Sequence, residues 1–160
     1  MSRMNVERVV AGGLVTGCLI VVSDFVLYGV VIEDSFVAAL ASLALPPPDA
    51  TADILLSGLG LLLGIGAVWL YAAILPRFGS GPGTAIIAGL ATWVFVCLLP
   101  DARAMALGVL PPTLIVVAAV WDLVELPVAT LVGAWLYRDA PARAAKRPGA
   151  DPRAPYPAGG

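Results

Sequence analysis

Two carboxylates and a proline interrupt an apolar stretch late in this 160-residue sequence. Asp122 and Glu125 are three residues apart, so a helix would place both side chains on one face. Pro127 has no N–H to donate to the carbonyl of Leu123, and we expect it to kink the helix there. Two carboxylates beside a freed carbonyl would form an oxygen-rich site, suited to a proton, a hydrated cation or a basic organic molecule.

A third carboxylate, Asp24, interrupts the first apolar stretch of the chain. Asp24 and Asp122 lie about eight to nine residues from the expected outer ends of their helices, which at about 1.5 Å per residue gives them similar depths. If the two helices touch, all three acids share one pocket, which Tyr28 and Trp121 would border. Repulsion among crowded carboxylates would favour keeping at least one proton, which is then available for exchange.

These acids allow two interpretations. An ionised carboxylate near the centre of a bilayer costs about 2.5–3.5 kcal/mol, so each acid is expected to face other helices. Neutral acids could simply tie helices together, although such hydrogen bonds average only about 0.6 kcal/mol. Three acids, with no lysine or arginine at the same depth, are more than is needed to hold two helices together. We therefore expect a proton- or cation-coupled transporter with Pro127 as its pivot; the alternative is a non-transporting membrane subunit or scaffold.

The composition is that of an integral membrane protein. Hydrophobic residues make up 60% of the sequence, charged residues only 12%, and the mean hydropathy is +0.96. A soluble domain is usually about a quarter charged, whereas a membrane-spanning helix needs about 20 mostly apolar residues. The predicted fold is a four-helix transmembrane bundle over residues 1–138, and the predicted spans are 9–32, 54–75, 83–99 and 113–137.

Shorter features complete this organisation. Residues 35–45 predict a short interfacial helix, and a loop is expected from Pro100 to about residues 111–112, which are both proline. The first apolar stretch is too long for a signal-peptide core, so we interpret it as a retained span. Gly60 and Gly64 form a small-xxx-small pair for close helix contact, expected in a homodimer. The tail, residues 139–160, lacks apolar periodicity and is expected to be disordered.

The two halves share short matches that suggest related helical hairpins. Residues 11–16 (AGGLVT) resemble 87–92 (IAGLAT), and residues 66–71 (GAVWLY) resemble 133–137 (GAWLY). The residues involved are common in any membrane helix, so chance similarity is the alternative. If real, the repeat is parallel.

The basic residues predict the orientation. With four spans both termini lie on one side, and that side would carry eight of the nine basic residues. The positive-inside rule then places both termini on the cytoplasmic side of the membrane, which we expect to be a bacterial inner membrane. There the basic tail could contact anionic lipids. The eight residues are Arg3, Arg8, Arg77, Arg138, Arg143, Lys146, Arg147 and Arg153; the ninth is Arg103.

The residues that are missing argue against catalysis. The sequence has no histidine, which removes Ser-His-Asp and Cys-His arrangements and the usual haem and zinc ligand. The turn at residues 79–83 lacks the lysine of a phosphate-binding loop. Cys18 and Cys97 are far apart in apolar stretches and predict inert thiols. We expect no enzyme, no cofactor, no bound metal and no nucleic-acid partner.

Three groups of residues carry a resemblance that covers residues 5–138: 11–17 with 24–29, 69–71 with 77–79, and 121–125 with 133–137. On these residues the sequence resembles small bacterial four-span membrane proteins of unknown function, a group that implies the fold but no activity. It is also similar in architecture to small multidrug transporters, whose first span carries a glutamate; here that acid is Asp24, and further acids occur in the fourth span.

Overall fold

The computed structural model describes residues 5–145 and the side chains of residues 5–137. All regular elements in this range are helical, and four stretches are long and apolar enough to cross a membrane, with mean hydropathies of 1.9 to 2.2. The predicted four-helix membrane bundle is therefore confirmed, and the protein is a multi-pass membrane protein. In chain order the elements are α1 (Val6–Val26), the π-helical η1 (Leu27–Val31), α2 (Glu33–Ser42), α3 (Ala50–Phe78), α4 (Pro82–Thr92), the π-helical η2 (Trp93–Leu98), α5 (Leu99–Ala106) and α6 (Pro112–Ala145).

The first two spans follow local capping chemistry. The first runs through α1 and η1 from Val6 to Val31, and α2 lies where the short interfacial helix is expected. The second span, α3, begins after Asp49, whose side chain accepts a 2.8 Å hydrogen bond from the Ala52 N–H. It ends at Gly79, whose φ of 78° is accessible to glycine with little strain.

The third span is longer than the expected 83–99. It continues through η2 and α5 as one apolar stretch, Pro82–Ala106, so the loop expected from Pro100 onward begins only after Ala106. The backbone of η2 is π-helical: the Leu99 N–H bonds to the carbonyl of Val94, five residues earlier, whereas in an α-helix the partner is four residues earlier. Pro100, which has no N–H, follows at the start of α5, where a proline is tolerated.

The fourth span runs from Pro112 to Tyr137, within one residue of the predicted 113–137, but its helix continues beyond the span. α6 continues to Ala145, so residues 139–145 are helical where a disordered tail was expected. Four of these seven residues are alanine, the best helix former, which favours continuation of the preceding helix despite Pro141. The remainder of the expected tail, 146–160, lies outside the described residues.

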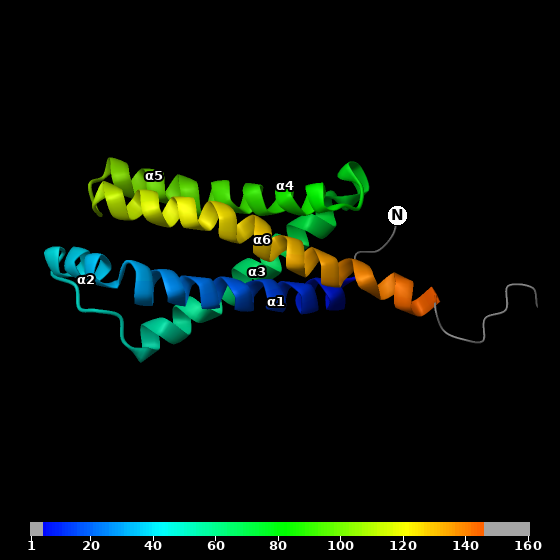
Figure 1. Ribbon diagram of the computed structural model, residues 1–160, viewed down its shortest axis with the longest axis horizontal. Coiled ribbons are helices and arrows are strands. Elements are labelled where there is room, and N and C mark those ends of the chain that lie inside the picture. Colours follow the sequence, from blue (N-terminus) through cyan, green and yellow to red (C-terminus); the bar gives the residue numbers. More distant parts are fainter. Residues whose placement is uncertain (1–4, 146–160) are drawn as a thin grey trace, which may run out of the picture.

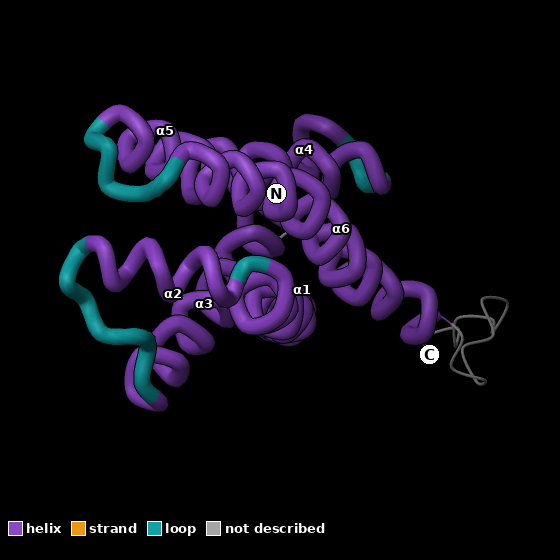
Figure 2. Tube along the Cα trace, turned by 60° about the vertical axis from the view of Figure 1, so that its left-hand side comes forward, coloured by secondary structure: helices purple, strands orange, loops and turns teal. Residues whose placement is uncertain are grey.

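The spans form a ring in which each helix contacts its chain neighbours. α1 packs against α3 and α6, and α4 packs against the same two helices from the other side. The start of α1, the turn between α3 and α4, and the end of α6 lie at one end of the bundle (Figure 1). The α2–α3 and α5–α6 loops both lie at the opposite end, apart from each other (Figure 2). A ring of this kind arises with or without duplication, so the related hairpins stay a prediction.

The closest helix contacts involve glycines of α1. A Cβ added to Gly64 would lie 2.5 Å from the Gly13 carbonyl oxygen, and one added to Gly17 would lie 2.6 Å from the Leu61 Cα. Gly60 belongs to the same contact, where an added Cβ would lie 2.8 Å from Val21. Gly60 and Gly64 thus serve close helix packing within one chain, and this contact occupies the face that the sequence assigned to a homodimer.

Large apolar side chains cover the outside of the bundle. Figure 1 shows the first turns of α3 diverging from α1, and on this segment leucines and an isoleucine are 60% to 73% exposed. In a soluble protein such a patch would mark an interface, but in a bilayer it is the surface that lipid solvates. These residues are Ile54, Leu55, Leu56, Leu59 and Leu62.

The α1–α3 contact gives a direct test of the packing. We expect Gly64→Ala to lower the free energy of unfolding by about 1–3 kcal/mol, because the added methyl group meets the α1 backbone. Gly66→Ala is the matched control on the same helix. Nothing lies within 4 Å of its added Cβ, so its stability should be unchanged or raised by up to about 1 kcal/mol. Denaturant titration in lipid–detergent micelles measures both variants, and equal stabilities would contradict this packing.

Candidate functional site

The three predicted acids converge between α1 and α6. Asp24 on α1 and Asp122 and Glu125 on α6 each offer a carboxylate oxygen, and these atoms all lie within 4.8 Å of one another. All three side chains are half-buried. The structure thus brings together residues about 100 positions apart in sequence, as expected if the first and fourth spans touch.

A hydrogen-bonded chain fixes one acid in place. The Ser23 hydroxyl donates to Glu125 Oε2 at 2.8 Å, and the Trp121 indole N–H donates to the Ser23 oxygen, also at 2.8 Å. Ser23 therefore links Trp121 and Glu125, one helical turn apart on α6, to α1. Sequence reasoning named Trp121 but missed Ser23, for which the only signal was its position beside Asp24.

The third span reaches the site through η2. The Cys97 thiol lies beside the Asp122 carboxylate, and the Trp93 indole donates a 2.9 Å hydrogen bond to the Ala119 carbonyl of α6. Cys97 is half-buried while Cys18 is exposed, so the two cysteines predicted as equivalent inert thiols differ. No sequence pattern connects Cys97 with Asp122, because the contact depends on how η2 lies against α6.

The two other predicted residues lie at the edges of the site. Tyr28 is within electrostatic range of Asp24 and Asp122, is 37% exposed, and packs its ring edge-on against Phe36 of α2 with centroids 5.1 Å apart. Pro127 lies within continuous α6, and its backbone is so close to α4 that a Cβ on Gly89 would be 2.5 Å from the Pro127 Cα. It is therefore also a packing surface for α4.

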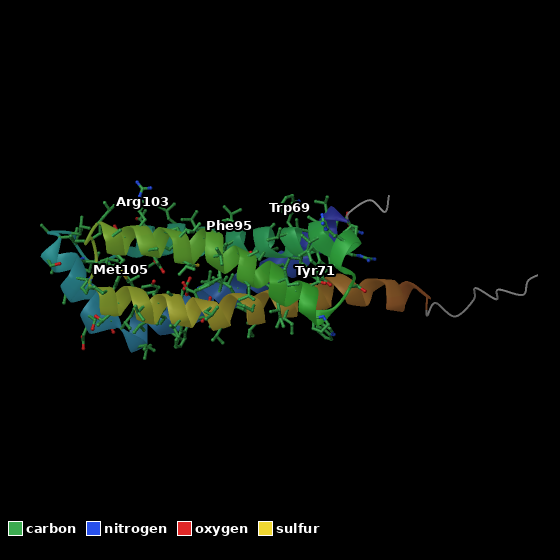
Figure 3. All side chains as sticks on the ribbon, turned by 90° about the horizontal axis from the view of Figure 1, so that it is seen from above. Trp69, Tyr71, Phe95, Arg103 and Met105 are labelled. Atoms are coloured by element: carbon green, nitrogen blue, oxygen red, sulfur yellow. The ribbon has the colours of Figure 1, made fainter. Side chains whose placement is uncertain are left out.

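The acids have no basic counterpart among the side chains of residues 5–137. This part of the chain contains three basic residues: Arg8 in the first turn of α1, Arg77 in the last turn of α3, and Arg103 on α5. Figure 3 shows the Arg103 side chain projecting away from the bundle. Negative charge at the site must therefore be balanced by protons, by water or by a bound cation.

A groove adjoins the acid cluster on the outside of the bundle. It has a volume of about 710 Å³ and lies between Leu19 and Ser23 of α1 and one face of α6, including Trp121 and Glu125. A second, smaller hollow of about 370 Å³ lies between η2, α5 and α6 and contains Asp101. Only the larger one reaches a member of the three-acid cluster.

Fold and site together define a helical membrane protein with an intramembrane carboxylate cluster. Comparison of the chain with protein-family models, with curated proteins and with solved structures gave no match. The resemblance to small four-span proteins stays a prediction, and the functional argument rests on the geometry alone. Chemically, three carboxylates can share and exchange protons, and their oxygens suit hard cations.

The Ser23 bridge can be tested by a double-mutant cycle. Ser23→Ala and Trp121→Phe each remove one partner of the same hydrogen bond, so their combined effect on the free energy of unfolding should be less than additive. We expect a coupling of about 0.6 kcal/mol, and at most about 1.7 kcal/mol. Ser57→Ala, which removes a hydroxyl from α3, serves as the control and should be additive with Trp121→Phe. Additive effects of Ser23→Ala and Trp121→Phe would contradict the bridge.

Proposed function

We propose that this protein is a small proton- or cation-coupled membrane transporter whose exchange site is formed by Asp24, Asp122 and Glu125. The observation that carries the proposal is the convergence of three carboxylates from two helices within 4.8 Å. No described basic side chain balances them. A membrane protein that keeps three acids together without a base must supply their countercharge from outside the bundle, as protons or as a cargo cation.

The polar surroundings support exchange rather than permanent burial. Each acid is only half-buried, so the protein does not seal the cluster, and Glu125 also borders the external groove. The Ser23 hydroxyl donates to Glu125. It bonds more strongly to a charged carboxylate than to a protonated one, so protonation of Glu125 weakens this contact between α1 and α6. Such coupling between protonation and helix contacts is what a carrier needs.

The alternative function is that of a non-transporting subunit or scaffold, and one observation favours it. The same polar groups tie α1 to α6: Ser23 bonds to Glu125, and the Thr16 hydroxyl donates to the Ala129 carbonyl at 3.1 Å. In this case the acids only fasten helices. The two functions differ in whether the carboxyl groups exchange protons with water in the folded protein.

The cellular setting forms part of the proposal. The excess of basic residues at one end supports a bacterial inner-membrane protein with both termini cytoplasmic. Contact between the basic tail and anionic inner-leaflet lipids would follow from that orientation. Lys146, Arg147 and Arg153 lie outside the described residues, so this part rests on the sequence alone.

Difference infrared spectroscopy of the purified protein in lipid tests the transporter. In the wild type we expect protonated-carboxyl bands that titrate reversibly with pH. In Asp24→Asn, Asp122→Asn and Glu125→Gln one band should be lost, and the remaining bands should titrate at lower pH, because one source of repulsion is gone. For interacting sites the shift is on the order of one pH unit or more.

The scaffold predicts a different result. Carboxyl bands that do not respond to pH over the range in which the protein stays folded, together with variants that only lose stability, would rule out the exchange site. Asp53→Asn is the control, because Asp53 lies exposed in the first turn of α3, away from the cluster. It should leave the titration of the three acids unchanged.

A further inference from the structure

The bundle is tightly closed on one side of the acid cluster. Between the cluster and the end at which α1 starts, α1 and α6 meet backbone to backbone, and a Cβ added to Gly12 would lie 2.7 Å from the Gly133 carbonyl oxygen. In the same half, Val68, Tyr71 and Thr130 are fully buried, with exposed fractions of 0%. Packing of this density leaves few voids as large as a water molecule. This half of the bundle therefore separates the acids from its own end.

Polar groups continue instead from the cluster toward the opposite end, where α2 lies. Tyr28, in η1, is three residues from the end of the first span. Asp101, in α5, is five residues from the end of the third span. At about 1.5 Å per residue, these positions lie about 5 Å and about 8 Å from the ends of their spans, whereas the three clustered acids lie about 10–20 Å inward. Tyr28 and Asp101 therefore occupy intermediate depths between the cluster and this end.

Tyr28 is the group that links Asp101 with the cluster. It is within electrostatic range of Asp122 and Asp24, and also of Asp101. The Cys97 thiol is a further titratable group near it. A phenolic hydroxyl can accept one hydrogen bond and donate another. The Tyr28 hydroxyl is thus suited to pass a proton between acids that belong to three different helices.

Asp101 lies where α5 meets α6. It lines the smaller hollow together with Val120 and Leu123, which flank Asp122 in the sequence, and it is within electrostatic range of Asp122. Arg103, two residues later, projects away from the bundle (Figure 3). The half-buried carboxylate of Asp101 thus places a negative charge near the end of the bundle, and such a charge attracts protons from the solution.

We propose that protons enter the exchange site from the end of the bundle at which α2 lies, with Asp101 as the outer acceptor and the Tyr28 hydroxyl as the relay to the cluster. This inference rests on the proposed function and names the access route of its exchange site. A proton that Asp101 takes from water passes to the Tyr28 oxygen, directly or through one water molecule, while the hydroxyl proton moves to a carboxylate of the cluster. Tyr28 is neutral before and after this step.

The proposed route also assigns a side to the conformation described here. The cluster exchanges protons with the α2 side, and exchange with the other side requires the contact between Gly12 and Gly133 to open. Tyr28 and Asp101 are relay residues in this account, since they deliver protons to the acids and do not belong to the cluster.

The test measures how fast the protein in nanodiscs takes up protons, by time-resolved infrared spectroscopy of the carboxyl bands after light releases protons from a caged acid. Tyr28→Phe and Asp101→Asn each remove one relay group, and we expect uptake to slow at least about tenfold in both. Asp101→Glu keeps the carboxylate and should retain the fast rate. The equilibrium titration of Tyr28→Phe should stay close to that of the wild type, because the group removed is neutral, whereas a general disturbance of the packing would change both rate and equilibrium.

Two matched variants at the opposite end locate the route. Tyr137→Phe removes the same hydroxyl from the end of the fourth span, and Glu7→Gln removes a carboxylate from the first turn of α1. Neither change should slow proton uptake. A normal rate in Tyr28→Phe or in Asp101→Asn would overturn the proposal, because protons would then reach the acids without the relay. Equal slowing in the two matched variants would overturn it as well.

The equilibrium titration of the same samples separates this inference from the proposed function. If the carboxyl groups titrate but their uptake rates are the same in the wild type and in both relay variants, the exchange site stands and the route is refuted. If the carboxyl groups do not titrate, the proposed function fails and the inference fails with it. Titrating carboxyls whose uptake slows in the relay variants alone would support both.

Discussion

The structure depends on the close approach of α1 to two other helices at once. In a bilayer there is no hydrophobic driving force between apolar helices, so contact relies on packing of small residues and on interhelical hydrogen bonds. α1 presents Gly13 and Gly17 to α3, and on an adjacent face Gly12 and Thr16 to α6. Each pair is spaced by four residues, so each forms a continuous strip along the helix. One helix thereby sets the positions of both its neighbours.

The α1–α6 strip also explains the depth at which the acids meet. Gly12 of α1 lies against Gly133 of α6, where an added Cβ would clash, and four residues later the Thr16 hydroxyl donates to the carbonyl of Ala129. Each advance of four residues along α1 therefore corresponds to a return of four residues along α6. Continuing this antiparallel register by two further steps brings Asp24 level with Trp121, next to Asp122. Glycine contacts near one end of the bundle thus determine which polar residues face each other farther along. The convergence of carboxylates follows from packing and needs no attraction among the acids themselves.

This explains which parts of the structure could be predicted from the sequence. Hydropathy gave the four spans, and counting residues from the span ends placed Asp24 and Asp122 at similar depths, because a helix has a fixed rise. Ser23, Cys97 and the groove were not predictable, since they depend on the relative rotation of helices and on the π-helical register of η2. The same register explains why Pro100 does not end the third span. Composition likewise could not show that the face of Gly60 and Gly64 is occupied within the chain.

The two contacts of α6 limit how a carrier of this design can move. Pro127 is pressed against Gly89 of α4, and Ala129, two residues further on, accepts from Thr16 of α1. A hinge at Pro127 could therefore open α6 only if α4 moved with it. By contrast, the Ser23–Glu125 bond between α1 and α6 is sensitive to charge, since a protonated Glu125 is a weaker acceptor. In the proposed transporter, a change in the charge of Glu125 would therefore act first on its bond to Ser23, whereas the expected pivot, Pro127, could move only together with α4.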